Sequence, residues 1–307
     1  MKIAKYENYF FILPGVLSLL AIAALLMWGL KPGIDLAGGS LLQVSYTGAM
    51  PTQEQVMTAA DALDIGEVRV QPAGQDGYVL RQRALTNDEK NSLEAALSTL
   101  GAMHEDQFTS IGPSLGTELV HKAWIAITLV VICIILFIAF AFRGVSKPVA
   151  SWKYGIVAII TLLHDVLIPV GLFAALGHFA GAEVDSLFIV ALLTILGISI
   201  NDTIVVFDRI RENLRLNAEH NKREEFDEVV GRSIMQTLAR SINTSVTVVI
   251  VLAALYFLGP ASTRDFALTL IVGMIAGTYS SIFLASPLLV VWQRLSASAS
   301  RRAEKSK

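Results

Sequence analysis

The feature that most restricts the fold of this chain is a series of long segments that contain no Asp, Glu, Lys or Arg. These segments run for 16 to 28 residues and recur along the 307-residue chain. A helix of about 20 apolar residues crosses a hydrocarbon core about 30 Å thick. Charged residues make up only 16% of the chain, against about 25% in soluble domains. This composition excludes a disordered chain and argues against a soluble enzyme, and we predict a polytopic α-helical membrane protein.

Six segments fit the length of a membrane span, and we predict transmembrane helices at residues 9–30, 123–142, 154–177, 186–207, 241–259 and 266–293. The first charge-free run, Asn8 to Leu30, has 23 residues. The apolar region of a cleaved signal peptide has only ~7–15, so we interpret this run as a retained anchor. The other segments are residues 1–8 as the N-terminus, 31–122 as a large loop, 208–240 as a loop with the start of the fifth helix, and 294–307 as a tail.

The distribution of Lys and Arg predicts the orientation of these spans. Arg143, Lys147 and Lys153 lie between the second and third spans with no acidic residue among them, and residues 208–240 hold seven Lys and Arg. Short loops rich in Lys and Arg remain in the cytoplasm, whereas long loops are translocated whatever their charge. We therefore expect both termini in the cytoplasm and residues 31–122 on the outer side.

The large outer loop has the pattern of a small α+β domain. Leu42, Val44 and Tyr46 alternate with polar residues, which predicts a strand. Two Thr residues each precede a Gln or Glu by three positions, which predicts two capped helices, and three further runs are typical of strands. The order strand, helix, strand, strand, helix, strand is ferredoxin-like. The supporting segments are Thr52 with Gln55, Thr86 with Glu89, strands at 67–71, 78–83 and 103–111, and a turn at 74–77.

This domain has no residue pattern that indicates catalysis or a bound cofactor. The chain's single cysteine, Cys133, excludes an intramolecular disulfide and a Cys-based zinc site. No His/Cys cluster, nucleophile–base pair or phosphate-binding loop is recognisable in the sequence, and a net charge of −2 gives no field that would favour nucleic acid. We expect no cofactor, no metal and no enzyme activity, and we interpret the domain as a contact surface.

The polar residues inside the predicted spans are the strongest functional signal. A charge at the centre of a membrane helix costs at least ~2.5–3.5 kcal/mol, so the few that occur are candidates for a function. Asp165 follows Lys153 by about 18 Å of helix, near mid-membrane and next to His164. Asp202 lies in the inner half of the fourth span, and Arg240 begins the fifth span from the same side. Asp202 and Arg240 are therefore expected to share a depth and to pair.

Two interpretations of these residues remain open from the sequence. The Asp202–Arg240 pair is either a structural ion pair or a proton-accepting carboxylate whose partner changes with conformation. Asp165 is either part of the same proton pathway or a carboxylate satisfied by His164 or a helix carbonyl. We take Asp202, Arg240 and Asp165 as candidate proton-pathway residues. The glycine-rich segments 33–39 and 112–116, where the domain joins its spans, are interpreted either as a hinge and a strut or as tight backbone crossings.

Several motifs occur in order over nearly the whole chain. They are Gly33-Ile34-Asp35-Leu36-Ala37-Gly38-Gly39, residues 197–213 around Asn201-Asp202-Thr203, Arg240-Ser241-Ile242-Asn243-Thr244-Ser245, residues 277–283 and Ala285-Ser286-Pro287. These segments resemble the SecF family of protein-export membrane subunits. One departure is Ile198, where that family often has Tyr, which removes a hydroxyl group but no carboxylate.

The resemblance implies a half-transporter of the resistance-nodulation-division type in a bacterial inner membrane. Such a subunit works with SecD beside the SecYEG channel and uses the proton motive force to promote late export of preproteins, after the ATP-driven step of SecA. Within the family, the positions of Asp202 and Arg240 are held to serve proton conduction. The alternatives are a proton-driven exporter of small molecules or lipids from the same superfamily, and a passive assembly subunit.

Overall fold

A computed structural model describes residues 7–74, 76–141 and 150–305. The residues Arg143 and Lys147, the N-terminal residues before Glu7 and Gln75 of the predicted turn lie outside the described residues. The chain divides into two compact units. The helical unit consists of the segments before Leu30, from Ile127 to Ala182 and after Val190, and the sheet unit consists of Lys31–Ala126 and Glu183–Ile189.

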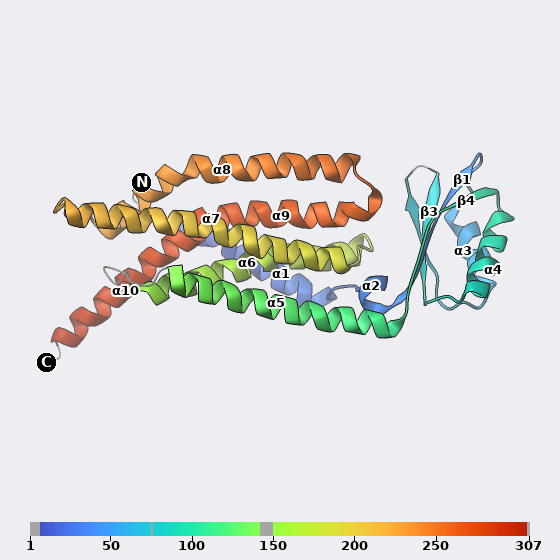
Figure 1. The fold of residues 1–307 in the computed structure, drawn as a ribbon, viewed down its shortest axis with the longest axis horizontal. Helices are drawn as coiled ribbons and strands as arrows, with labels where there is room; N and C mark the ends of the chain where they lie inside the picture. Colours follow the sequence, from blue (N-terminus) through green and yellow to red (C-terminus); the bar gives the residue numbers. More distant parts are fainter. Residues whose placement is uncertain (1–6, 75, 142–149, 306–307) are drawn as a thin grey trace. The chain divides into compact units, whose positions relative to one another are not determined.

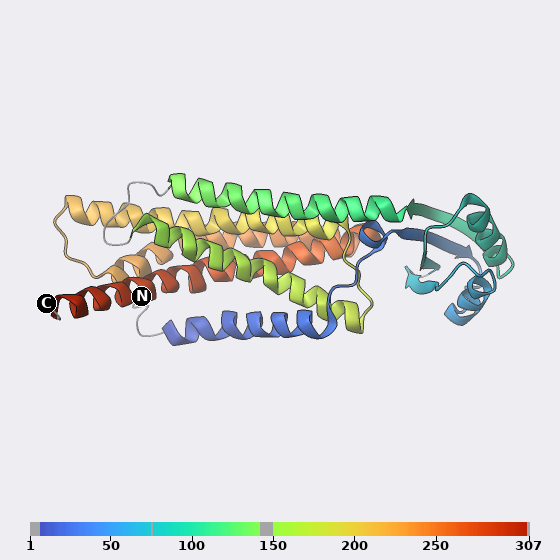
Figure 2. The ribbon, with the colours of Figure 1, turned by 90° about the horizontal axis from the view of Figure 1, so that it is seen from below.

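In the described part of the chain, six helical segments are long and apolar enough to cross a membrane. This confirms the predicted polytopic α-helical class. The first of these segments begins and the last of them ends at the same end of the helical unit, as an even number of crossings requires (Figures 1 and 2). The helices are α1 (Glu7–Trp28), α5 (Pro113–Ala141), α6 (Ser151–Phe179), α7 (Ser186–Glu219), α8 (Phe226–Leu258) and a composite sixth segment of α9 (Arg264–Ser280), the π-helical turn η3 (Ser281–Ala285) and α10 (Ser286–Lys305), preceded by the short 3-10 helix η2 (Ala261–Thr263).

Several helix boundaries differ by ten residues or more from the sequence prediction. Helix α5 begins at Pro113, ten positions before the predicted span, because proline is favoured in a first helical turn, where its missing N–H would have no partner. The segment predicted as a loop at 208–240 is mostly helical, since α7 continues to Glu219 and α8 begins at Phe226. Buried residues such as Ile210 and Val229 stabilise this extension by packing.

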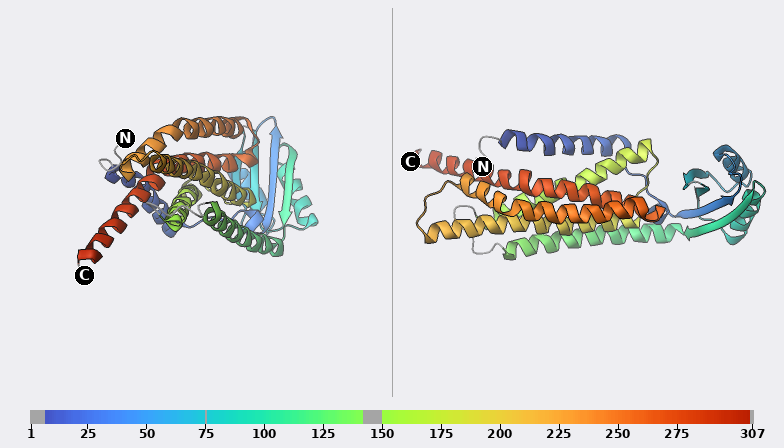
Figure 3. Two further views of the ribbon diagram at one scale, coloured as in Figure 1. Left: turned by 60° about the vertical axis from the view of Figure 1, so that its left-hand side comes forward. Right: turned by 90° about the horizontal axis from the view of Figure 1, so that it is seen from above.

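Small residues bring the membrane helices into close contact. A Cβ atom at Gly171 of α6 would collide with the backbone of Ala21 in α1, and one at Gly273 of α9 would collide with Ile195 of α7. Without a hydrophobic driving force between helices in lipid, such close approach is a main source of packing energy. Helices α8 and α9 lie side by side in all views (Figures 1 and 3).

The sheet unit has the predicted ferredoxin-like topology. Its four strands are all antiparallel in the order β2-β3-β1-β4, and α3 and α4 lie on one face of the sheet (Figure 1). Leu42, Val44 and Tyr46 are buried as expected, against Leu93 and Leu97 of α4. The elements are β1 (Gly39–Thr47), α3 (Gln53–Asp61), β2 (Arg69–Ala73), β3 (Gly77–Gln82), α4 (Asn87–Ser98) and β4 (Ala102–Ile111).

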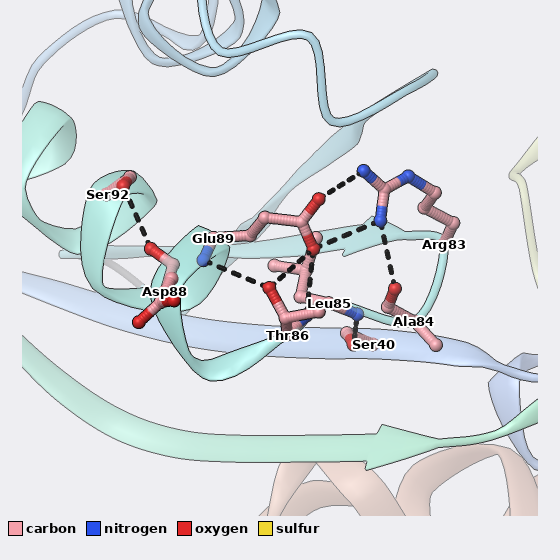
Figure 4. A network of polar contacts seen from close by, with 8 residues as sticks. All are labelled: Ser40, Arg83, Ala84, Leu85, Thr86, Asp88, Glu89 and Ser92. Carbon is pink, nitrogen blue, oxygen red and sulfur yellow. Dashed lines mark hydrogen bonds and ion pairs between the residues drawn. The ribbon is translucent and has the colours of Figure 1, made fainter.

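Both predicted capping boxes are present. At α4, the Thr86 hydroxyl accepts from the Glu89 N–H, and the Glu89 carboxylate accepts from the Thr86 N–H at 2.8 Å (Figure 4). Arg83 donates to the same carboxylate at 2.5 and 3.1 Å. The hydrogen bond from Arg83, followed by those from Thr86, lowers the pKa of Glu89 to about 2.

The two glycine segments at the joints form one tight crossing. Gly38, which follows the short helix α2 (Ile34–Ala37) with a φ of 80°, lies against Pro113, where a Cβ would be 2.8 Å from the Pro113 Cα. A Cβ at Gly116 would be 2.8 Å from the Gly38 nitrogen. Of the two predicted roles, the structure therefore favours a backbone crossing over a free hinge at Gly33–Gly39.

The entry to the sheet unit is also tied to the segment that leads into α7. The Gly33 N–H donates to the Val184 carbonyl and the Val184 N–H donates to the Lys31 carbonyl, both at 2.8 Å. The Asp35 carboxylate accepts from the Ser186 hydroxyl at 2.5 Å. These contacts make the N-terminal end of α7 part of the sheet unit.

Candidate functional site

Asp165 lies on α6 and is fully buried. The Nδ1 atom of His164 lies 2.8 Å from its Oδ1 atom. The hydroxyl of Ser199 on α7 donates to its Oδ2 atom. Of the two partners that the sequence suggested for Asp165, His164 and a helix carbonyl, the structure shows His164. It adds the hydroxyl group of Ser199 as a second partner.

Asp202 lies on α7, three positions after Ser199, where three segments converge. Its Oδ1 atom accepts from the Ser241 hydroxyl of α8 at 2.7 Å. Its Oδ2 atom accepts from the Ser281 hydroxyl of η3 at 3.1 Å. Residues three apart on a helix share a face, so Ser199 and Asp202 connect the Asp165 cluster with the junction of α7, α8 and η3.

Further hydroxyl groups extend this junction along α8 and α9. Ser245 follows Ser241 by one helical turn and donates to its carbonyl at 2.9 Å. The Ser245 and Thr278 hydroxyls lie 2.5 Å apart and join α8 to α9. Gly277 of α9 permits close approach to α7, because a Cβ there would be 3.2 Å from Ser199 Cβ. The polar groups are therefore held by small residues on each neighbouring helix.

A small cavity with both apolar and polar walls lies beside Asp202. Its volume is about 30 Å³, which is room for one or two water molecules. Carboxylate, amide and hydroxyl groups in its wall offer the hydrogen bonds that a buried water requires. The lining includes Ser199, Asn201, Asp202, Thr244, Ser245 and Thr278.

In this conformation Asp202 bonds to Ser241 and Ser281 and does not pair with Arg240. Arg240 is exposed and forms no ion pair or hydrogen bond with any residue that the structure describes. Successive residues point in different directions around a helix, so when Ser241 faces Asp202, Arg240 is turned away. The sequence predicted the depth of Arg240 along the helix but not its direction.

The π-helical turn η3 is a site feature that the sequence analysis missed. A π turn carries one more residue than an α turn and is frequent at functional sites. Here it carries Ser281 to Asp202, and the Ser286 hydroxyl donates to the Ser281 carbonyl at 3.3 Å. Both serines are fully buried. The signal in the sequence was the presence of three serines, Ser280, Ser281 and Ser286, in an apolar span.

The site presents two carboxylates, several hydroxyl groups and one imidazole. Each carboxylate accepts a hydrogen bond from at least one hydroxyl group, and neither contacts a Lys or Arg among the described residues. Over the same ranges, no group of three His, Cys, Asp or Glu side chains gathers to hold a metal ion. The titratable side chains of the site are Asp165, Asp202 and His164.

Two protein families match the sequence. The family described as "Protein export membrane protein SecD/SecF, C-terminal" matches residues 92–295. The family described as "SecD/SecF GG Motif" matches residues 28–50, which include the crossing at Gly38. The first of these matches contains all three predicted site residues.

Curated relatives are similar over nearly their full length. The chain is 43% identical over 307 residues to "Protein translocase subunit SecF" of Thermobaculum terrenum, with 95% of this chain and 94% of the relative covered. It is 35% identical over 300 residues to the protein of the same name from Anaerolinea thermophila, again with 95% and 94% covered.

Two solved structures are similar to the fold. The crystal structure of SecDF from Thermus thermophilus, described as a translocon-associated membrane protein, superimposes with a TM-score of 0.83 at 31% identity. A structure titled as SecDF in a super-membrane-facing form gives a TM-score of 0.69 at 30% identity. The alignments cover 96% and 99% of this chain but only 39% and 40% of those longer chains.

Proposed function

This chain belongs to the SecF family of protein-export membrane proteins, and we propose that it is an auxiliary subunit of the Sec protein translocase in which protons crossing the membrane drive late steps of export. The chain is a multi-pass membrane protein, and its role is that of a translocase accessory subunit. The finer proposals are a bacterial inner membrane location, cytoplasmic termini and a sheet unit in the periplasm.

The proposed partners are SecD, the SecYEG channel with its SecA-driven translocase, and exported preproteins. Support for SecD comes from the solved relatives, which are SecDF chains of which this chain spans about two fifths. A half-transporter of six spans needs a second subunit to form the whole transporter. Large apolar side chains on α1 and α8, such as Leu19 and Ile250, are exposed, as expected for surfaces that meet lipid or another membrane subunit.

The observation that carries the proton-driven proposal is Asp202, a partly buried carboxylate that has two hydroxyl donors and no cation among its described neighbours. Burying a charge without a paired cation is costly, so we propose this carboxylate as the group that binds and releases the proton. A protonated carboxyl group becomes a donor through one oxygen. One of the hydrogen bonds from Ser241 and Ser281 must then break or reverse. This changes the contact of α7 with α8 or with η3.

Arg240 enters this proposal as the alternative partner of the ionised carboxylate. It is adjacent to Ser241, so a rotation of α8 by one residue position would bring the guanidinium to the place of the hydroxyl. A proton that crosses the membrane potential gains about 2.3 kcal/mol per 100 mV. This energy shifts a two-state equilibrium by a factor of tens per 100 mV, which is enough to alternate Asp202 between its two kinds of partner.

The test is Asp202→Asn, measured as proton-dependent preprotein export into inverted membrane vesicles. Asn keeps the size of the side chain and one acceptor oxygen but cannot carry a proton, so export should lose its dependence on the proton gradient. The control is Asp208→Asn on the same helix, at an exposed position where Arg211 lies 3.7 Å away. Gradient-dependent export at the wild-type level in Asp202→Asn would reject the proposal. Export of small molecules or lipids is less well supported, because a cavity of about 30 Å³ is far below the ~300–1,000 Å³ of ligand pockets.

A further inference from the structure

His164 is a buried titratable group that the proposed mechanism leaves unused. Its side chain is 5% exposed. Its Nδ1 atom lies 2.8 Å from Asp165 Oδ1, and its Nε2 atom has no hydrogen-bond partner within the described ranges. A buried imidazole with one nitrogen on a carboxylate and the other unpartnered is unusual, because buried polar atoms are nearly always hydrogen-bonded.

The charge balance around this pair indicates an additional proton. Asp165 is 0% exposed and receives only the Ser199 hydroxyl and the His164 imidazole. An ionised carboxylate beside a neutral imidazole would leave a full negative charge in the interior, which is strongly unfavourable. One extra proton, on either the imidazole or the carboxyl group, brings the net charge of the pair to zero.

No other described charge compensates Asp165. The helices that pack against α6 are α1, α5, α9 and α10, together with η3 and, through Ser199, α7. Their described side chains in α1 and η3 include no titratable group. Those of the other elements form no bond to His164 or Asp165; they are Glu118, His121 and Lys122 on α5, Asp202 and the charged residues after it on α7, Arg264, Asp265 and Tyr279 on α9, and Arg294 on α10.

Ser199 links this pair to Asp202. It donates to Asp165 Oδ2 and lies three positions before Asp202 on the same helix. Ser199 and Asp202 also line the same cavity of about 30 Å³, which has room for a water between them. A hydroxyl group both donates and accepts, so Ser199 is able to pass a proton from the cavity to Asp165.

We propose that His164 and Asp165 together bind one proton and form a second proton-binding site, which exchanges its proton with Asp202 through Ser199. The inference rests on the proposed proton-driven function. In the transfer step, the Asp202 carboxyl group releases its proton to a cavity water, and that water gives a proton to Ser199 Oγ. Ser199 gives its own hydroxyl proton to Asp165 Oδ2. Each O–H bond that breaks is replaced by one that forms, and the step leaves an Asp202 carboxylate and a neutral His164–Asp165 pair.

A purely structural role for His164 makes a different prediction. If the imidazole only orients Asp165, a Gln that keeps a hydrogen bond to the carboxylate should replace it with little effect on proton transfer. If the pair binds the transported proton, Gln removes its basic group. The two roles are therefore separated by the pH dependence of transport rather than by the amount of folded protein.

The first experiment compares His164→Gln with His178→Gln in the complex isolated from native membranes and reconstituted in vesicles. His178 lies on the same helix, is exposed and stacks on Trp28 with ring centroids 5.1 Å apart. We expect gradient-driven proton flux to fall on the order of 100-fold in His164→Gln, the scale of a lost proton-transfer group. We also expect its pH profile to lose one ionisation, with no change in the control. A wild-type flux and pH profile in His164→Gln would overturn the proposal.

A second measurement covers the case in which His164→Gln does not fold, and it needs no transport. The chain has five histidines, so nitrogen-15 NMR of labelled histidine and infrared spectroscopy of the carboxyl groups, with Asp165→Asn for assignment, report the protonation of the pair in the wild-type complex. An imidazolium at His164 or a protonated Asp165 at neutral pH supports the proposal. A neutral imidazole beside an ionised Asp165 rejects it, and does so independently of whether Asp202 drives export.

Discussion

The sheet unit and the helical unit place their polar groups in opposite ways. In the sheet unit, apolar residues such as Leu42 and Leu93 are completely buried, and ion pairs such as Arg83–Glu89 lie at the surface. In the helical unit, Asp165 is buried, while Leu19 is 69% exposed. Water satisfies polar groups at the surface of the first unit, whereas hydrocarbon cannot do so around the second. Polar groups in the helical unit must therefore form hydrogen bonds with one another. When one of them is removed, no water takes its place as a partner.

The largest expected effect comes from placing a charge on the exposed surface of each unit. Leu19→Lys places a charge on an exposed face of α1, which should cost at least ~2.5–3.5 kcal/mol for insertion. Met57→Lys, at a side chain that is 42% exposed on α3, should change stability by no more than about 0.5 kcal/mol. Membrane-inserted and folded fractions of both variants measure the difference. Equal tolerance of the two substitutions would contradict the assignment of Leu19 to a lipid or subunit surface.

The next effect concerns the closeness of helix packing. Gly171→Ala pushes a methyl group into the backbone of Ala21, and overpacking of this kind costs about 1–3 kcal/mol. Gly15→Ala on α1 meets nothing within 4 Å and should be neutral or stabilising, because Ala favours helix more than Gly does. Thermal unfolding in detergent, together with crosslinking between α1 and α6, distinguishes them. A Gly171→Ala variant as stable as Gly15→Ala would show that α1 and α6 separate easily.

A smaller effect is expected at the cap of α4 in the sheet unit. Thr86→Ala removes the hydroxyl that accepts from the Glu89 N–H and should cost about 1 kcal/mol. Ser92→Ala removes a hydroxyl that bonds only to a carbonyl of its own helix, at Asp88 (Figure 4), and should be nearly neutral. Hydrogen exchange of the α4 amides in the full chain measures both. We expect the effect of Thr86→Ala to be confined to the sheet unit and to leave proton-dependent export unchanged. A loss of export would contradict the contrast between the two units.

The smallest effect is a pH dependence at the same surface. The pKa of Glu89 falls from an ordinary 4.5 to about 2 in the folded chain, so its ionised form stabilises the fold. This contribution is fully present above pH 4.5 and is lost as the pH falls through about 2. Glu89→Gln and Arg83→Gln should each flatten the acid dependence of hydrogen exchange in α4. An unchanged acid profile in both variants would contradict the role of the Arg83–Glu89 contact.

The sequence predicted those parts of the fold that depend on local signals. The absence of charge over the spans, the alternation at Leu42, Val44 and Tyr46, and the Thr86–Glu89 box act within a few residues of one another, so they survive any tertiary arrangement. The extension of α7 to Glu219 was missed because its charged residues resemble a loop. That segment is helical because its apolar face packs on α8 and not because of composition.

The site was predicted in part for the same physical reason. Charged residues in an apolar span identified Asp165 and Asp202, since burial of a charge is costly anywhere in a membrane. The partners of Asp202 were not predicted, because they depend on the rotation of α8 and on the extra residue in η3. Neither rotation nor a π turn leaves a periodic signal in the sequence. His164 was visible next to Asp165, but its unpartnered Nε2 atom emerges only from packing.

The π turn at Ser281–Ala285 places one surplus residue in an otherwise α-helical span. A helix advances by about 100° per residue, so a surplus residue sets the segment after it out of phase with the segment before it. If the surplus residue moves one position along the chain, the residues it passes turn by this angle, while the connecting loops keep their length. Such a shift would turn Ser281 relative to Asp202, and the hydrogen bond from Ser286 to the Ser281 carbonyl opposes it.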